Sequence, residues 1–112
     1  MAIRRVTGEQ SSSGPTCSVT EFGKVGAADL AEVAINGRYP QQGFSINHES
    51  DMMIRVIAGT GAIALRGVGY ELHPGNVIHI DKETPYYYEG EQLLVLLISS
   101  PAWSKEQYEI VN

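Results

Sequence analysis

The sequence has one cysteine, no long hydrophobic run and no apolar leader. Cys17 stands alone in 112 residues, so no disulfide can form within the chain. The longest uninterrupted apolar run covers residues 93–98, far short of the roughly twenty residues of a membrane-spanning helix. The start of the chain lacks the apolar core of a secretory signal peptide. These absences predict a cytoplasmic protein without a membrane partner.

Positive charge is also scarce. Eight Lys and Arg residues are scattered among 13 Asp and Glu residues, for a formal net charge of −5. A protein that neutralises a phosphate backbone needs clustered basic side chains. The charge balance therefore argues against a nucleic-acid partner.

The chain is long enough for one domain with its own hydrophobic core. Hydrophobic residues make up 43% of it, which excludes a chain that is disordered throughout. The first twenty residues include Ser11, Ser12, Ser13, Gly14 and Pro15 and few apolar side chains. We predict a flexible N-terminal arm over residues 1–20 and a folded domain over residues 21–112.

Short segments rich in β-branched and aromatic residues fill the domain and alternate with Gly, Pro and Asn. This spacing is typical of an all-β sandwich or barrel. The expected strands cover residues 30–35, 43–48, 52–58, 62–66, 70–72, 76–80, 86–89 and 93–99. Turns are expected between them, including one at residues 59–61 and one at residues 89–90.

Alternation along a strand indicates which side chains point inward. Residues 44, 46 and 48 share one face, apolar up to His48, so we expect His48 on the core side. Met52 and Ile54 share the inward face of the next segment, because Arg55 marks the opposite face as solvated. Tyr86 and Tyr88 point one way and Tyr87 the other.

Residues 93–98 do not alternate at all, which predicts a strand covered on both faces. In a small barrel a second subunit often provides that cover, so we predict a homodimer. The N-terminal arm is a candidate for pairing with the partner's sheet. Ser104 and Gln107 form a capping-box pattern that predicts one short helix over residues 105–110, with Trp103 packing it on the barrel.

Four stretches carry a resemblance to a known family. They are residues 37–40 and 47–61, residues 70–80, and residues 100–108. Together they resemble small single-domain members of the cupin superfamily, over about residues 30–111. The resemblance implies an antiparallel jelly roll with a short C-terminal helix.

The resemblance also implies where a cupin metal would bind. The usual ligands are a His-x-His pair, a Glu and a third His, which fall here at Ile46, His48, Met52 and Tyr86. Only His48 is an ordinary ligand for a divalent transition metal. We therefore predict no metal and no cofactor at this position. A rearranged site that uses His48 and His79 stays open as the alternative.

Without a metal, His48 and Tyr86 are the candidate catalytic residues. His48 titrates near neutrality, and a tyrosine opposite it can donate a proton. This pairing resembles the base and acid of metal-free cupin epimerases. The alternative is that His48 is a satisfied, partly buried histidine and that the tyrosines only pack.

The pocket wall would contain further ligand-binding residues. The candidates are Met52, Ile54, Tyr88, Arg38 and His79. Arg38 either binds an anionic group or lies on the surface near an acid such as Glu49.

Two functions follow from this reading. The barrel binds a small polar, sugar-derived molecule and acts on it as a metal-independent isomerase or epimerase, or it is a non-catalytic ligand-binding or sensing module. A metal-dependent enzyme with a rearranged site is a third possibility.

Overall fold

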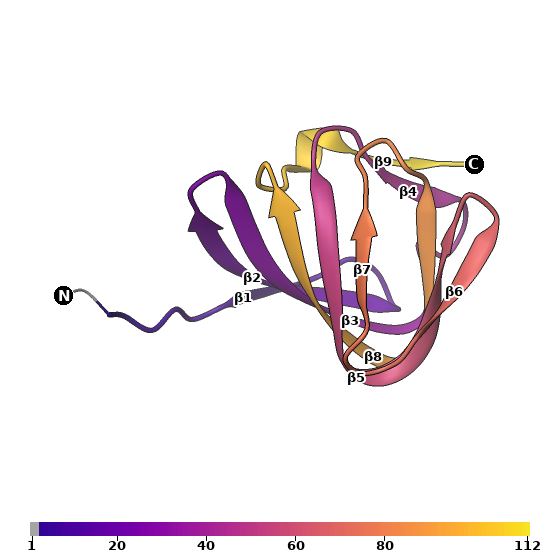
Figure 1. Cartoon of the computed structure of the whole chain (residues 1–112), viewed down its shortest axis with the longest axis horizontal. Coiled ribbons are helices and arrows are strands. Elements are labelled where there is room, and N and C mark those ends of the chain that lie inside the picture. Colours follow the sequence, from indigo (N-terminus) through magenta and orange to yellow (C-terminus); the bar gives the residue numbers. More distant parts are fainter. Residues whose placement is uncertain (1–2) are drawn as a thin grey trace.

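The computed structural model of the chain describes residues 3–112 and is almost entirely β-structure (Figure 1). Within these residues, one curled sheet contains nine strands, and the only helical element is a single 3-10 turn. The elements are β1 (Glu9–Ser12), β2 (Cys17–Val25), β3 (Ala28–Tyr39), β4 (Phe44–Asn47), β5 (Asp51–Leu65), β6 (Val68–Leu72), β7 (Val77–Ile80), β8 (Tyr86–Ser100), η1 (Lys105–Gln107) and β9 (Tyr108–Val111). The predicted antiparallel all-β class is confirmed.

The sheet runs β1-β2-β3-β8-β4-β9, and β5 joins it beside β8. Strand β5 also pairs with β6 and with β7, so it forms a second layer that curls back over the core. Every pairing is antiparallel. Figure 1 shows these layers enclosing the barrel interior, with η1 and β9 across the top.

Two of the expected turns are not turns. Residues 59–61 lie within β5, and residues 89–90 lie within β8, so each pair of predicted strands is one long strand. Gly61 and Gly90 face each other in this pairing, and a Cβ at Gly90 would come within 2.6 Å of the Ile35 carbonyl oxygen. The glycines therefore let long strands bend past each other closely, which the sequence pattern does not distinguish from a turn.

The predicted C-terminal helix over residues 105–110 is wrong. Lys105–Gln107 form one 3-10 turn without a side-chain cap from Ser104, and Tyr108–Val111 form strand β9 instead. An isolated helix of six residues is marginal because nucleation is costly, whereas β9 gains a complete register with β4.

The segment that we expected to be a loose arm contains ordered structure. Strand β1 pairs with β2 of its own chain, and Cys17 at the start of β2 is buried in the core. Within residues 3–112, no helix is both long enough and apolar enough to span a membrane.

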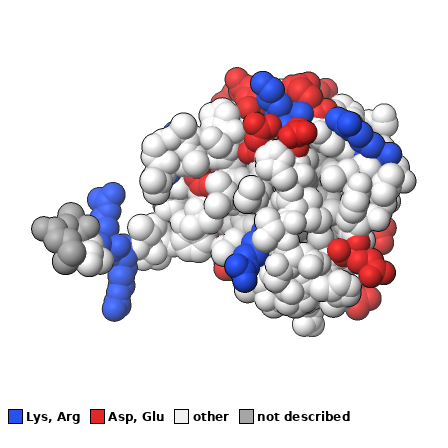
Figure 2. All heavy atoms as spheres, in the orientation of Figure 1, with Lys and Arg blue, Asp and Glu red and all other residues white. Residues whose placement is uncertain are grey.

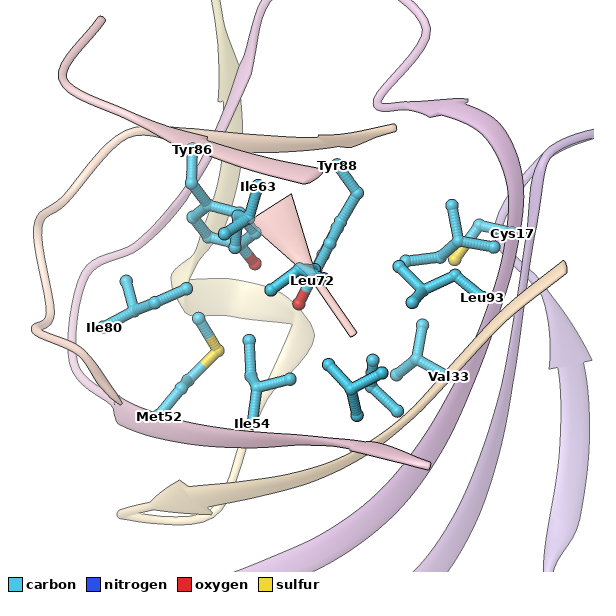
Figure 3. Close-up of a cluster of buried hydrophobic side chains, with 13 residues drawn as sticks. Cys17, Val33, Met52, Ile54, Ile63, Leu72, Ile80, Tyr86, Tyr88 and Leu93 are labelled. Atoms are coloured by element: carbon cyan, nitrogen blue, oxygen red, sulfur yellow. The ribbon is translucent and has the colours of Figure 1, made fainter. Parts of the chain in front are cut away.

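The core fills the barrel interior and comes from every layer. Figure 3 shows its side chains converging from opposite walls. The buried apolar members include Val33, Ile35, Met52, Ile54, Ile63, Leu72, Ile80, Tyr86, Tyr88, Leu93 and Val95. The inward orientation expected for Met52, Ile54, Tyr86 and Tyr88 is the one observed.

Candidate functional site

Strand β4 carries polar side chains into the barrel. Ser45 and Asn47 are buried, whereas Phe44 and Ile46 are only partly buried and His48 is exposed. Our expectation that Phe44, Ile46 and His48 form the inward face is wrong, because the alternate residues Ser45 and Asn47 point inward instead. Alternation alone does not decide which face is inward, and here hydrogen bonds from distant strands compensate the burial of the polar face.

The first set of these hydrogen bonds is a row of three hydroxyls. Tyr108 Oη, from β9, lies 2.6 Å from Ser45 Oγ and 3.1 Å from Tyr39 Oη. Two hydrogen bonds use two of the three hydroxyl hydrogens, so one donor and several lone pairs stay available. The row therefore keeps both a donor and acceptors that these two hydrogen bonds do not use.

Asn47 organises the second set. Its Nδ2 donates to Tyr86 Oη at 3.2 Å and lies 3.3 Å from the Met52 sulfur. Its Oδ1 accepts a hydrogen bond of 2.9 Å from Trp103 Nε1. Because the Asn47 amide donates to the Tyr86 oxygen, the phenolic hydrogen of Tyr86 is itself free to donate.

The tyrosines of this cluster are neutral hydrogen-bonding groups. Burial raises the pKa of Tyr39, Tyr86 and Tyr88 above the ordinary range. The rings of Tyr86 and Tyr88 pack edge to face, with centroids 5.6 Å apart. The cluster thus combines hydroxyls, an amide and aromatic surfaces, with no charged side chain among Tyr39, Ser45, Asn47, Tyr86, Tyr88, Trp103 and Tyr108.

The C-terminal segment closes this end of the barrel. Trp103 and Tyr108 pack against each other, with ring centroids 5.9 Å apart, and each also bonds to β4. Gln107 lies between Trp103 and Tyr108 in the sequence, and its side chain is buried. Its Oε1 accepts hydrogen bonds from the backbone amides of Glu49 and Ser50. Trp103 keeps 36% of its surface exposed, so the cluster meets solvent at this ring.

His48 lies outside the barrel, between two carboxylates. Its Nδ1 is 3.0 Å from Glu83 and its Nε2 is 2.8 Å from Glu109. Hydrogen bonding to Glu109, then to Glu83, raises the pKa of His48. The sequence did not reveal these partners, because Glu83 and Glu109 lie 35 and 61 residues away.

The structure does not bring His48 and Tyr86 together. The phenol of Tyr86 is buried beside Asn47, and the imidazole of His48 is on the opposite face of β4. The expected arrangement of the two across a common barrel mouth is therefore not present.

Arg38 is committed to local contacts. Its guanidinium donates to the carbonyl oxygens of Pro40 and Gly43 at 2.6 and 3.0 Å and lies 3.9 Å from the centroid of the Tyr87 ring. These contacts place it on the outer side of β8, away from the buried tyrosines. Its expected acidic neighbour, Glu49, is not among its partners.

His79 is on the outer face of β7, where its Nδ1 lies 3.3 Å from Asp81. It stands opposite Met53 in the register of β5 and β7. Within residues 3–112, no three His, Cys, Asp or Glu side chains gather in a way that could hold a metal ion.

No family model and no curated protein matches the chain in sequence. Solved structures do match its fold. A point variant of Streptomyces PAC13 with uridine superposes with a TM-score of 0.85 at 18% identity, covering 100% of this chain and 93% of that one. Pac13 is called a nucleoside dehydratase.

Two further neighbours are more distant. KdgF from Halomonas sp. has a TM-score of 0.71 at 16% identity over 83% of this chain and 87% of its own. Ectoine synthase from P. lautus has a TM-score of 0.70 at 15% identity over 90% and 80%. These proteins are cupins, so the chain has the cupin-type jelly-roll fold that its sequence resembles.

The residues present do not fit the usual cupin metal. The inward positions nearest to the expected ligand set are Ser45, Asn47, Met52 and Tyr86. They offer a hydroxyl, an amide, a thioether and a phenol, whereas transition metals in such sites are held by imidazole, carboxylate or thiolate groups.

Proposed function

We propose that this cupin-fold chain binds a small, uncharged, polar molecule of the sugar or nucleoside type at the end of the barrel closed by Trp103 and Tyr108. The observation that carries the proposal is the buried cluster of neutral donors and acceptors around Ser45, Asn47 and Tyr108. A neutral polyol or nucleoside can share these hydrogen bonds without bringing an unpaired charge into the barrel.

Aromatic surfaces support the same ligand class. Tyr86, Tyr88, Tyr108 and Trp103 surround the polar groups, and such rings stack on the faces of sugars and bases. The fold neighbour that was solved with uridine supports a nucleoside as the first compound to test. Met52 and Ile54 complete the apolar wall.

The cluster favours binding over acid–base catalysis. A general base near neutrality needs a pKa close to the working pH, and burial raises the pKa values of the interior tyrosines away from it. His48 titrates closer to neutrality, but it faces outward between Glu83 and Glu109. We therefore favour the ligand-binding or sensing alternative over the epimerase-like one.

Entry of a ligand requires the C-terminal segment to move. Trp103 and Tyr108 are only partly buried. The Trp103 side chain is held to β4 through one hydrogen bond, whereas Tyr108 bonds to Ser45 and Tyr39 and also pairs with Asn47 in the β4–β9 register. Displacement of residues 103–108 would break the Gln107 hydrogen bonds and the Asn47–Tyr108 pairing of β4 and β9, and it would open this end of the barrel without separating the long strands β3, β5 and β8.

The proposal is tested by titrating the protein with uridine, other uncharged nucleosides and neutral sugars, using isothermal calorimetry and backbone amide NMR shifts. We expect saturable binding, with the largest shifts at β4 and at residues 103–108. Tyr108→Phe removes the central hydroxyl of the row and should weaken binding about three- to tenfold. Tyr87→Phe, on the outer face of the same strand as Tyr86, is the matched control and should bind normally.

Two results would change the proposal. Absence of saturable binding across this set of compounds, or equal losses in Tyr108→Phe and Tyr87→Phe, would rule out the barrel cluster as the binding site. Conversion of a bound nucleoside or sugar, detected by chromatography and reduced on the order of 10²-fold in Tyr86→Phe, would make the protein an enzyme.

A further inference from the structure

The outer face of the sheet formed by β3, β8, β5 and β7 carries many exposed or half-buried apolar side chains, with few charged ones among them. Its apolar members come from all four strands. They are Leu30, Met53, Val77, Leu94, Leu96 and Ile98. Exposure reaches 46% at Met53, 47% at Ile98 and 55% at Val77, which is high for side chains of this kind arranged side by side. Figure 2 shows a largely uncharged surface over these strands, with acidic groups and neighbouring basic groups along its upper edge.

Strand register places these residues in rows. Ile98 stands between Leu30 and Met53, and Met53 in turn faces His79. The next row has Leu96 at its centre, with Glu32 on one side and Arg55 on the other. Glu32 and Arg55 are thus about 9.6 Å apart, two strand spacings, with an apolar side chain between them.

Neither charge has an ion-pair partner in the part of the chain that the structure describes. The two charges are opposite in sign and lie symmetrically about β8. If the same face of a second copy packs against this one, each Glu32 can therefore form an ion pair with an Arg55 of the other copy.

We propose that this outer face binds a second copy of the chain, around a twofold axis that lies between the two sheets and parallel to β8. This axis places the partner's Glu32 over Arg55 and the partner's Arg55 over Glu32. Leu96 and Ile98 then meet their own copies at the axis. The other twofold axis in the sheet plane, perpendicular to β8, brings Glu32 against the partner's Glu32, so the charges select the first arrangement.

A hollow at one end of the face supports the same arrangement. It has a volume of about 450 Å³ and lies between the β1–β2 turn and strands β3 and β8, with Ser18, Ala34 and Leu94 among its lining residues. The proposed symmetry brings the same end of the partner's β5 over it, where Ile57 is 41% exposed at a β-bulge. In this arrangement the exposed Ile57 of one copy would enter the hollow of the other.

The size of the face sets the expected affinity. Five strands from β2 to β7, over the five residues 94–98, span about 24 Å by 17 Å. This is smaller than the roughly 800 Å² per partner of a standard interface, so we expect dissociation in the micromolar range. Sedimentation velocity on the full chain should give a mass near 12.2 kDa at low concentration and twice that mass as the concentration rises.

Charge reversal tests the pairing directly. Glu32→Arg alone and Arg55→Glu alone should each weaken the dimer about tenfold or more, because like charges then face each other. The double variant restores the opposite charges and should return to within about threefold of the original dissociation constant. Arg66→Glu, on the exposed β5–β6 turn, is the matched control and should leave dimerisation unchanged.

Crosslinking tests the position of the axis. Ile98→Cys should crosslink to its own copy with a short bismaleimide, because residue 98 lies at the axis. His79→Cys, two strands away in the same row, should not, because its two copies would be about 19 Å apart. The only native thiol, Cys17, is buried.

A chain that remains monomeric at about 0.5 mM, well above the expected dissociation constant, would overturn the proposal. So would a dimer that the double charge reversal fails to rescue, or one in which His79→Cys crosslinks and Ile98→Cys does not. Either of the last two results would assign the contact to another surface.

Discussion

His48 Nε2 lies 2.8 Å from the Glu109 carboxylate, which joins the end of β4 to β9 on the outside of the barrel. Glu83 holds the other ring nitrogen at 3.0 Å. The two carboxylates favour the imidazolium form of His48, so its pKa lies above the ordinary 6.5. Folding is therefore coupled to the protonation of a surface side chain.

This coupling predicts the pH dependence of stability. Because the pKa of His48 is raised on folding, its contribution is complete below pH 6.5 and is lost as the pH rises through the raised value. Urea unfolding at a series of pH values should show this loss, and His48→Gln should flatten it. NMR titration should give His48 a pKa above 6.5 that falls further in Glu109→Gln than in Glu83→Gln. A pKa of His48 equal to that of histidine in a model peptide would contradict the prediction.

Asn47→Ala should destabilise the fold by about 2–4 kcal/mol. The change removes the buried partner of Tyr86 and Trp103 together with the contact to Met52. Asn36→Ala is the matched control, since Asn36 is exposed and accepts one hydrogen bond from the Gln92 amide. Asn36→Ala should lower the free energy of unfolding by about 1 kcal/mol or less in the same denaturation experiment. Comparable decreases in the free energy of unfolding of both variants would show that the Asn47 contacts contribute no more than an exposed hydrogen bond.

Gln107→Ala should loosen the closure of the barrel. The buried Gln107 accepts from the amides of Glu49 and Ser50 and donates to Ser50 Oγ at 2.7 Å. Loss of these contacts should cost about 2–3 kcal/mol and raise hydrogen exchange at residues 47–50 and 103–111. Glu106→Ala, exposed in the same 3-10 turn, should change neither quantity. Unchanged exchange in Gln107→Ala would mean that the segment is held by other contacts.

Cys17 should be unreactive while the protein is folded. Burial raises the pKa of its thiol to about 11 from an ordinary value of 9.0, which lowers the thiolate fraction about 100-fold near neutral pH. Alkylation with iodoacetamide, followed by mass spectrometry, should be slower by at least this factor in the native state than after denaturation. Rapid labelling of the native protein would show that β2 opens readily.

Metal removal should leave the protein unchanged. The inward groups Ser45, Asn47, Met52 and Tyr86 do not form a donor set for zinc, iron, nickel or manganese. We expect the thermal midpoint to be the same before and after dialysis against EDTA, and elemental analysis to find no stoichiometric metal. One equivalent of metal that is lost in both His48→Ala and His79→Ala would instead support the rearranged site.

Local patterns in the sequence were sufficient where one face of a strand is clearly solvated. Arg55 identifies the outer face of β5, so the inward orientation of Met52 and Ile54 follows from alternation. For Tyr86 and Tyr88, alternation indicated only a shared face, and the cupin resemblance at Tyr86 indicated that this face points inward. Short β-rich segments and the cupin resemblance were enough to predict the fold class.

Other features depend on residues that are far apart in the chain, and only the tertiary structure decides them. Gly61 and Gly90 look like turn residues until β5 and β8 pair and bring them face to face. Tyr108 and Trp103 decide which face of β4 points inward, because a buried Ser45 or Asn47 is stable only when a hydrogen-bond partner reaches it. His48 is turned outward by the same choice, because neighbouring side chains of a strand point to opposite faces. The sequence by itself therefore determined the class of fold, and the long-range hydrogen bonds decided which side chains form its interior.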